Sequence, residues 1–171
     1  MDAIVKKKKK KLLESDKERW EHNTIVDLIR NDLSMVSEDV EVTRFRYIDR
    51  VEAHRRSLLQ VSSEIRGRLS PQWPSQLGSL LLELLPAGSI SGAPKKKTVE
   101  IIRTAEQQDR GYFTGICGYY DGKCLDSGVL IRYMEHTPGG LQFRSGGGIT
   151  GHSEARAEYD ELIQKVYVPV I

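Results

Sequence analysis

The stretch from Tyr112 to Gly148 reads YFTGICGYYDGKCLDSGVLIRYMEHTPGGLQFRSGGG, and its turn signals determine the class of fold. Asp121-Gly122 is a strong signal for a hairpin, and Pro138-Gly139-Gly140 supplies a second group of turn residues. Segments rich in β-branched and aromatic residues lie beside these turns and favour strands. The stretch therefore predicts three antiparallel strands, near residues 112–120, 124–134 and 140–146.

The regions on both sides of this stretch carry two further kinds of pattern. Alternation of polar and apolar residues predicts two more strands, over residues 40–47 and, less cleanly, 58–69. Apolar residues at helical spacing predict three helices, at about 16–33, 94–108 and 154–167. Pro94 suits the first position of the second of these helices. With no internal repeat, the mixture of helices and antiparallel strands is typical of the α+β class.

Composition restricts the class of protein further. A chain of 171 residues, of which 39% are hydrophobic, is about one domain long and can build a core. Its net charge of +2 gives no overall field that would attract nucleic acid or a membrane surface. No signal peptide or membrane span is visible, so we expect a cytoplasmic protein. We expect residues 1–14, which include the lysine run Lys6–Lys11, to be a poorly ordered basic start, and residues 15–171 to form the domain.

The two cysteines, Cys117 and Cys124, lie on either side of the Asp121-Gly122 turn. A two-residue turn would place them diagonally across the hairpin, which does not favour a disulfide. Without a CxxC motif or a second cysteine cluster, a zinc site is also poorly supported. We therefore expect reduced thiols.

Two pairs of glutamates stand three residues apart on the outer helices: Glu18 with Glu21, and Glu158 with Glu161. Each pair projects from one face of its helix, and two such faces could meet around one hard cation such as magnesium. Solvated surface carboxylates are the alternative, and spacing does not exclude it. Glu18 also fits as the acid of a capping box that begins at Ser15.

Three other features could bind an anion. The glycines from Gly146 to Gly148 lie between a strand and a helix, where bare backbone could approach a ligand or form a tight turn. Lys95 to Lys97 oppose the dipole of their helix, which favours exposure to solvent over contact with an anion. Arg132 lies in an apolar strand and needs a partner there, either a protein carboxylate or a substrate carboxylate.

Taken together, four ordered blocks of sequence resemble the chorismate-using enzymes, which include anthranilate, aminodeoxychorismate, isochorismate and salicylate synthases. The resemblance covers nearly everything from Ser15 to Ile171. The blocks are KERWEH (17–22) with IVDLIRNDL (25–33), SGAPK (91–95), DSGVLIR (126–132), and GGGI (146–149) with EYDE (158–161). The resemblance implies a layered sandwich with antiparallel sheet and flanking helices, here incomplete.

The resemblance also implies roles for individual residues. Glu21 and Glu161 match the family's direct magnesium ligands, while Glu18 and Glu158 match the catalytic acidic shell around them, often through water. The residues that match substrate-binding positions are Ser89, Arg132, Gly146, Gly147 and Lys165. The implied cofactor is Mg²⁺ and the implied ligand is the dianion chorismate.

Within the family, the GGGI and Glu158-Tyr159 wording looks most like the synthase component I of aminodeoxychorismate synthase, also called para-aminobenzoate synthase. That resemblance implies amination of chorismate toward 4-aminobenzoate and folate, with ammonia from a glutamine amidotransferase partner. An anthranilate or isochorismate synthase, and a chorismate-binding chain without turnover, stay open as alternatives.

Two departures from the family pattern matter. The Pro-x-Lys-Gly-Thr segment, whose lysine is the covalent nucleophile in aminodeoxychorismate synthases, does not occur in the sequence. We therefore expect a truncated form of the enzyme, which by itself makes no aminodeoxychorismate. Leu59 stands where the family pattern leads one to expect a histidine.

Overall fold

The computed structural model describes residues 13–14, 16–53, 56–151 and 153–166. The lysine run, most of the basic start and Ser15 of the expected capping box lie outside these residues. By its internal contacts the chain divides into two units, Met1–Ile101 and Ile102–Ile171. Each unit is described by itself below.

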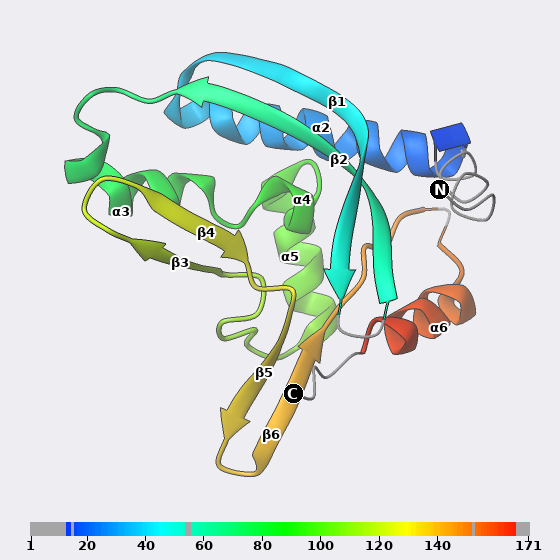
Figure 1. Ribbon diagram of the computed structural model, residues 1–171. Helices are drawn as coiled ribbons and strands as arrows, with labels where there is room; N and C mark the ends of the chain where they lie inside the picture. The colour runs from blue at the N-terminus through cyan, green and yellow to red at the C-terminus, as the bar shows by residue number, and fades with distance from the viewer. Residues whose placement is uncertain (1–12, 15, 54–55, 152, 167–171) are drawn as a thin grey trace. The chain divides into compact units, whose positions relative to one another are not determined.

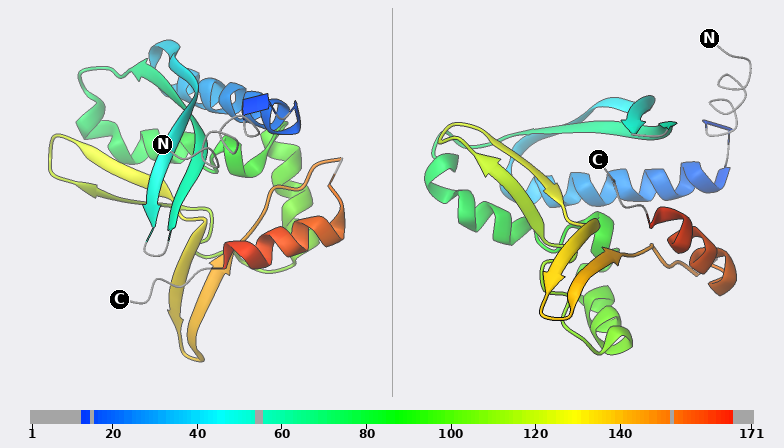
Figure 2. Two further views of the ribbon diagram at one scale, coloured as in Figure 1. Left: turned by 45° about the vertical axis from the view of Figure 1, so that its right-hand side comes forward. Right: turned by 60° about the horizontal axis from the view of Figure 1, so that its bottom comes forward.

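The first unit is built around one long helix and one long hairpin. Helix α2 (Asp16–Val36) packs against strands β1 (Glu38–Ala53) and β2 (Arg56–Arg68), and the hairpin runs alongside the helix (Figures 1 and 2). The strands pair antiparallel, with Val42 opposite Ile65 and Ile48 opposite Val61. Both predicted strands and the predicted helix are thus confirmed, each longer than the pattern indicated.

Three helices complete this unit and lead into the next: α3 (Trp73–Leu84), the one-turn α4 (Gly88–Ser91) and α5 (Lys95–Glu106). Helices α3 and α4 pack on α2. Pro94 precedes α5, and its carbonyl accepts a hydrogen bond from the Thr98 amide at 3.1 Å. The predicted helix therefore begins one residue later than Pro94.

The burial of α2 explains its place in the unit. Val26 is only 6% exposed, and Ile29 and Leu33, three and seven residues further along, are partly buried. This spacing puts the three side chains on one stripe of the helix. His22 extends the contact, because its Nε2 lies 2.7 Å from the Ser63 hydroxyl on β2. Burial, and then the nearby Arg46 charge, lower the pKa of His22 below its usual 6.5.

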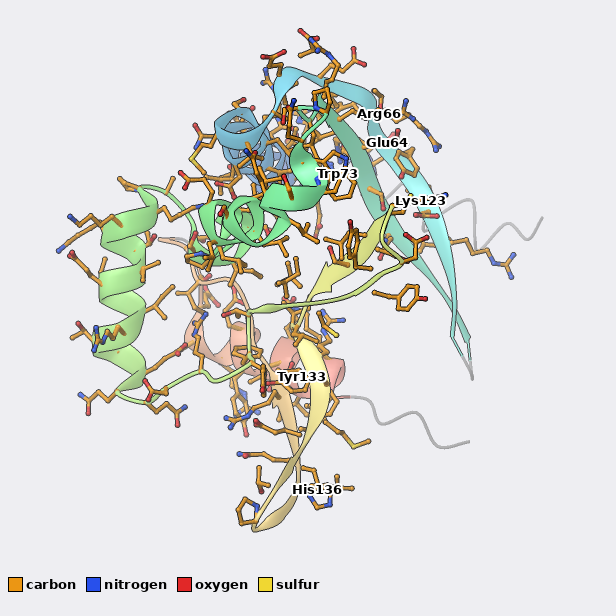
Figure 3. The ribbon with its side chains drawn as sticks, turned by 90° about the vertical axis from the view of Figure 1, so that its left-hand side faces the viewer. Glu64, Arg66, Trp73, Lys123, Tyr133 and His136 are labelled. Carbon is orange, nitrogen blue, oxygen red and sulfur yellow. The ribbon has the colours of Figure 1, made fainter. Side chains whose placement is uncertain are left out.

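The second unit holds two hairpins and a helix. Strand β3 (Ile116–Tyr120) pairs with β4 (Leu125–Val129), β5 (Arg132–Thr137) pairs with β6 (Gly140–Ser145), and α6 spans Ala155–Lys165. Tyr133 and His136 lie on β5 (Figure 3), opposite Arg144 and Leu141. Antiparallel pairing and the α+β class are confirmed.

The prediction of one strand over 124–134 is wrong. Backbone bonds between Thr114 and Leu130, and between Leu130 and Gly115, end the β3–β4 ladder. The chain then bends at Ile131, and from Arg132 it pairs with β6 instead. The apolar residues of 124–134 are thus divided between two hairpins. Periodicity alone does not distinguish this arrangement from one long strand. Residues 112–115 form turns and do not belong to the first strand.

The turn at Asp121 was predicted correctly in place but is wider than two residues. The Asp121 side chain accepts hydrogen bonds from the Lys123 and Cys124 amides, both at 2.7 Å, and Gly122 takes a φ of 92°. These backbone bonds, the one from Cys124 first, lower the pKa of Asp121. Cys117 pairs with Gly128, and Cys117 and Cys124 are both free and exposed, as expected.

Among the described residues no helix is both long and apolar enough to cross a membrane.

Candidate functional site

In the first unit the candidate residues lie on α2 and α4. Glu18 and Glu21 are exposed and stand one helical turn apart on α2. Ser89 is exposed on α4. The expected common face for the two glutamates follows from this placement on a regular helix.

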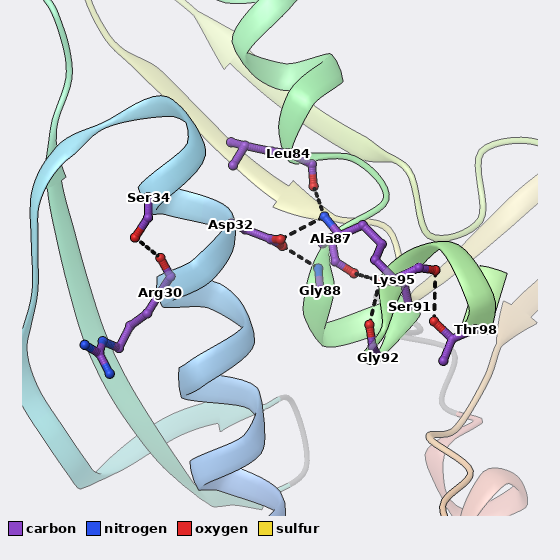
Figure 4. A network of polar contacts seen from close by, with 10 residues as sticks. All are labelled: Arg30, Asp32, Ser34, Leu84, Ala87, Gly88, Ser91, Gly92, Lys95 and Thr98. Atoms are coloured by element: carbon purple, nitrogen blue, oxygen red, sulfur yellow. Dashed lines mark hydrogen bonds and ion pairs between the residues drawn. The ribbon is translucent and has the colours of Figure 1, made fainter.

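A buried polar network connects these two helices, and sequence reasoning did not find it (Figure 4). Asp32, only 4% exposed, accepts a hydrogen bond from the Gly88 amide at 2.6 Å. Its other carboxylate oxygen lies 2.8 Å from the Lys95 ammonium. Lys95 also reaches the Leu84 carbonyl at 3.5 Å. One carboxylate and one ammonium thus bring together α2, the end of α3, α4 and the start of α5.

The approach of Asp32 requires a glycine at position 88. A Cβ there would lie 2.8 Å from the Asp32 carboxylate and 3.1 Å from the Leu28 Cβ. Either distance is too short for a methyl group without movement of the neighbouring atoms. Gly88 therefore fixes how closely α4 approaches α2.

The expectation that Lys95 is exposed is wrong, whereas Lys96 and Lys97 are exposed. The reason is the position of Asp32 on the apolar stripe of α2, three residues after Ile29. A carboxylate on a buried stripe needs a hydrogen-bonded countercharge. The charge of Asp32 among the apolar residues of this stripe was therefore the signal in the sequence that could have predicted the Asp32–Lys95 ion pair.

In the second unit Glu158 is held against the glycine segment. Ser153 donates a hydrogen bond to one Glu158 oxygen at 2.8 Å and accepts one from the Thr150 amide at 3.1 Å. The other Glu158 oxygen would lie 3.9 Å from a Cβ built on Gly147. The structure thus places two predicted site residues, Glu158 and Gly147, side by side.

Glu161 and Lys165 form an ion pair of 2.5 Å on α6. The pair is the ordinary i,i+4 contact of a helix surface and is partly exposed. Glu161 is therefore oriented toward a cation, here an ammonium group of the same helix.

Gly146 and Gly147 lie after β6 in a segment without regular secondary structure, not in the tight turn that was the alternative. Neither has a positive φ. At Gly146 the need is space, because a Cβ would lie 2.9 Å from the Phe113 ring. Gly147 is exposed, with its backbone accessible.

Arg132 is exposed at the first position of β5, opposite Ser145. The argument that burial forces a partner on Arg132 is therefore wrong, because the bend at Ile131 places it at the end of a hairpin. Within the described part of the chain no ion pair to Arg132 is seen. Two enclosed hydroxyls nearby in sequence, Tyr133 Oη and Ser145 Oγ, also have no hydrogen-bond partner among the described residues.

The carboxylates fit magnesium by their chemistry, since it prefers hard oxygen donors and keeps part of its water shell. Taken separately, neither unit groups three His, Cys, Asp or Glu side chains for a metal among its described residues.

Comparison with known proteins gives one family and consistent relatives. The sequence pattern of the family described as chorismate binding enzyme matches residues 2–170. An uncharacterized PabA-like protein of Pasteurella multocida is 59% identical over 99% of this chain and 52% of its own length. A PabA-like protein of Haemophilus influenzae is 54% identical over the same shares. The anthranilate synthase component 1 of Arthrobacter globiformis is 35% identical over 93% of this chain and 29% of its own length.

Two solved structures share the fold. Anthranilate synthase component I of Streptococcus pneumoniae superposes with a TM-score of 0.76 at 32% identity, over 95% of this chain and 36% of that one. A Bacillus anthracis protein described as a 2,3-dihydroxybenzoate-specific isochorismate synthase gives 0.74 at 25% identity, over 95% and 43%. The chain thus spans about half the length of the PabA-like relatives and a smaller share of the others.

Proposed function

The chain belongs to the chorismate-binding enzyme family, and from this we propose that it binds chorismate. We further propose that it is a relative of aminodeoxychorismate synthase component I and takes part in the amination of chorismate toward 4-aminobenzoate and folate. The observation that carries the proposal is the match along nearly the whole chain, with identity highest to PabA-like proteins among the relatives compared. The GGGI segment and Glu158-Tyr159, which resemble aminodeoxychorismate synthases, agree with this choice.

We assign the magnesium ligands to Glu21 and Glu161, with Glu18 and Glu158 completing the acidic shell through water. The support is that each pair stands one turn apart on a regular helix. Glu158 is further held by Ser153 beside Gly147. When bound, magnesium would stabilise negative charge on substrate oxygens.

The remaining candidates suit a dianionic substrate. Arg132 would hold a chorismate carboxylate with two parallel N–H donors, and its exposure leaves it accessible to a ligand. The backbone amides around Gly146 and Gly147 would donate to the substrate, and Ser89 would supply a hydroxyl. Lys165, now paired with Glu161, would turn to the substrate when the metal takes the carboxylate. A glutamine amidotransferase is the proposed source of ammonia.

Two kinds of relative support a different reaction of chorismate as the alternative. Anthranilate synthases are 34–37% identical over about nine-tenths of this chain, and one solved relative is described as an isochorismate synthase. The alternative is therefore anthranilate or isochorismate formation, or chorismate binding without turnover.

The product identifies the reaction. The purified chain is incubated with chorismate, magnesium and ammonium, and the separate lyase that releases 4-aminobenzoate is then added. Because the lysine of Pro-x-Lys-Gly-Thr does not occur in the chain, we expect it to bind chorismate and leave it unreacted. Formation of 4-aminobenzoate would support the proposed amination and show that the activity does not depend on that lysine. Formation of anthranilate or isochorismate would overturn the amination in favour of the alternative, and absence of chorismate binding would overturn the proposed function.

A further inference from the structure

Helix α4 carries Ser89 but is only four residues long, so it needs outside contacts to hold its position. Its own bonds are local: the Ser91 hydroxyl donates to the Ala87 carbonyl at 3.1 Å, and the Gly92 amide donates to the Gly88 carbonyl at 2.8 Å. The bond from the Gly88 amide to Asp32 spans 56 residues and attaches this turn to α2.

Lys95 completes that attachment. Its ammonium faces the Asp32 carboxylate and the Leu84 carbonyl, so it neutralises a charge that would otherwise be costly to bury. The Asp32 carboxylate is 6% exposed and the Lys95 side chain 28%, so solvent weakens their attraction far less than at a surface pair.

We infer that Asp32 and Lys95 are positioning residues, which hold Ser89 on α4 in fixed relation to Glu18 and Glu21 on α2. Neither residue is proposed to touch the reacting groups. The role rests on the proposed function, because only a substrate that contacts both helices would depend on their relation. Lys95 is thereby assigned to the scaffold, and not to anion binding.

A double-mutant cycle separates positioning from folding. Lys95→Met leaves a buried carboxylate without its countercharge, and Asp32→Asn leaves a half-buried ammonium without its partner, so both single variants should melt earlier. In the double variant no charge is left buried, and the melting temperature should recover. Chorismate affinity should stay about tenfold weaker, the difference between a charge-assisted and a neutral hydrogen bond at Gly88. Lys95→Arg should rescue part of the affinity of Lys95→Met.

The control is the Glu106–Arg110 pair, whose cationic side chain is enclosed about as much as Lys95, at 26% exposed, and whose carboxylate side chain is more exposed than Asp32, at 35%. The variant with Glu106→Gln and Arg110→Met should bind chorismate as the unsubstituted chain does. If the Asp32/Lys95 double variant recovers both melting temperature and affinity, the pair is merely structural and the inference is overturned.

A second readout needs no substrate. Amide hydrogen exchange across residues 88–92 should be about tenfold faster in the double variant than in the unsubstituted chain. If the unsubstituted chain binds no chorismate, the proposed function fails, and exchange still tests the attachment of α4. Unchanged exchange at Gly88 would then overturn the inference by itself.

Discussion

The two units hold their candidate residues in different ways. All four residues of the described chain that are classed as buried, Val26, Asp32, Gly88 and Ser91, belong to Met1–Ile101. There the decisive contact joins residues 56 apart. In Ile102–Ile171 the candidate carboxylates are held by neighbours four or five residues away, Lys165 and Ser153.

This difference separates two kinds of mutational effect. In the first unit, position and stability depend on the same buried contacts, so a change near α4 should cost folding free energy. In the second unit the contacts are local and partly exposed, so a change should affect ligand affinity with little effect on folding.

The largest expected effect is at Gly88. Gly88→Ala places a methyl group 2.8 Å from the Asp32 carboxylate, and we expect a loss of about 1–3 kcal/mol in the free energy of unfolding. Denaturant unfolding measures it. Gly78→Ala on α3 is the control, because nothing lies within 4 Å of its Cβ, and there alanine should be neutral or stabilising. Equal stability of the two variants would contradict the close approach of α4 to α2.

A smaller effect is expected at Ser153. Ser153→Ala removes the bond to Glu158 and should weaken magnesium binding about three- to tenfold, corresponding to about 0.5–1.5 kcal/mol for one hydrogen bond. Metal titration gives the affinity, and thermal melting should hardly change. Ser75→Ala, which removes a local bond to the Gln72 carbonyl, is the control. If Ser153→Ala instead lowers the melting temperature strongly and leaves magnesium affinity unchanged, the contacts of the second unit support folding as those of the first unit do.

Local chemistry explains which parts of the fold could be predicted from sequence. The turn at Asp121-Gly122 and the three predicted helices carry their signals within a few residues, and the structure has them, whereas α3 and α4 were not predicted. The division of residues 124–134 between two hairpins depends on which strand each segment pairs with, and no local pattern contains that information. The exposure of Arg132 follows from that division.

In the candidate site, too, only features with a local signal could be predicted from the sequence. The glutamate pairs could be found because i,i+3 spacing is visible in the sequence and the family resemblance gave it meaning. The Asp32–Lys95 pair joins two distant segments, and only the charge of Asp32 on an apolar stripe pointed to it. The contact of Glu158 with Ser153 and Gly147 depends on the path of the loop, which spacing does not define.

As proposed, magnesium-dependent binding of chorismate should require both Glu21 and Glu161. Calorimetric titration of chorismate with and without magnesium tests it, using the unsubstituted chain, Glu21→Gln from the first unit and Glu161→Gln from the second. Glu83→Gln, an exposed glutamate on α3, is the control. We predict that magnesium strengthens chorismate binding in the unsubstituted chain and the control, and that either site substitution removes this gain. A full magnesium-dependent gain in either site variant would contradict the assignment of that glutamate as a magnesium ligand.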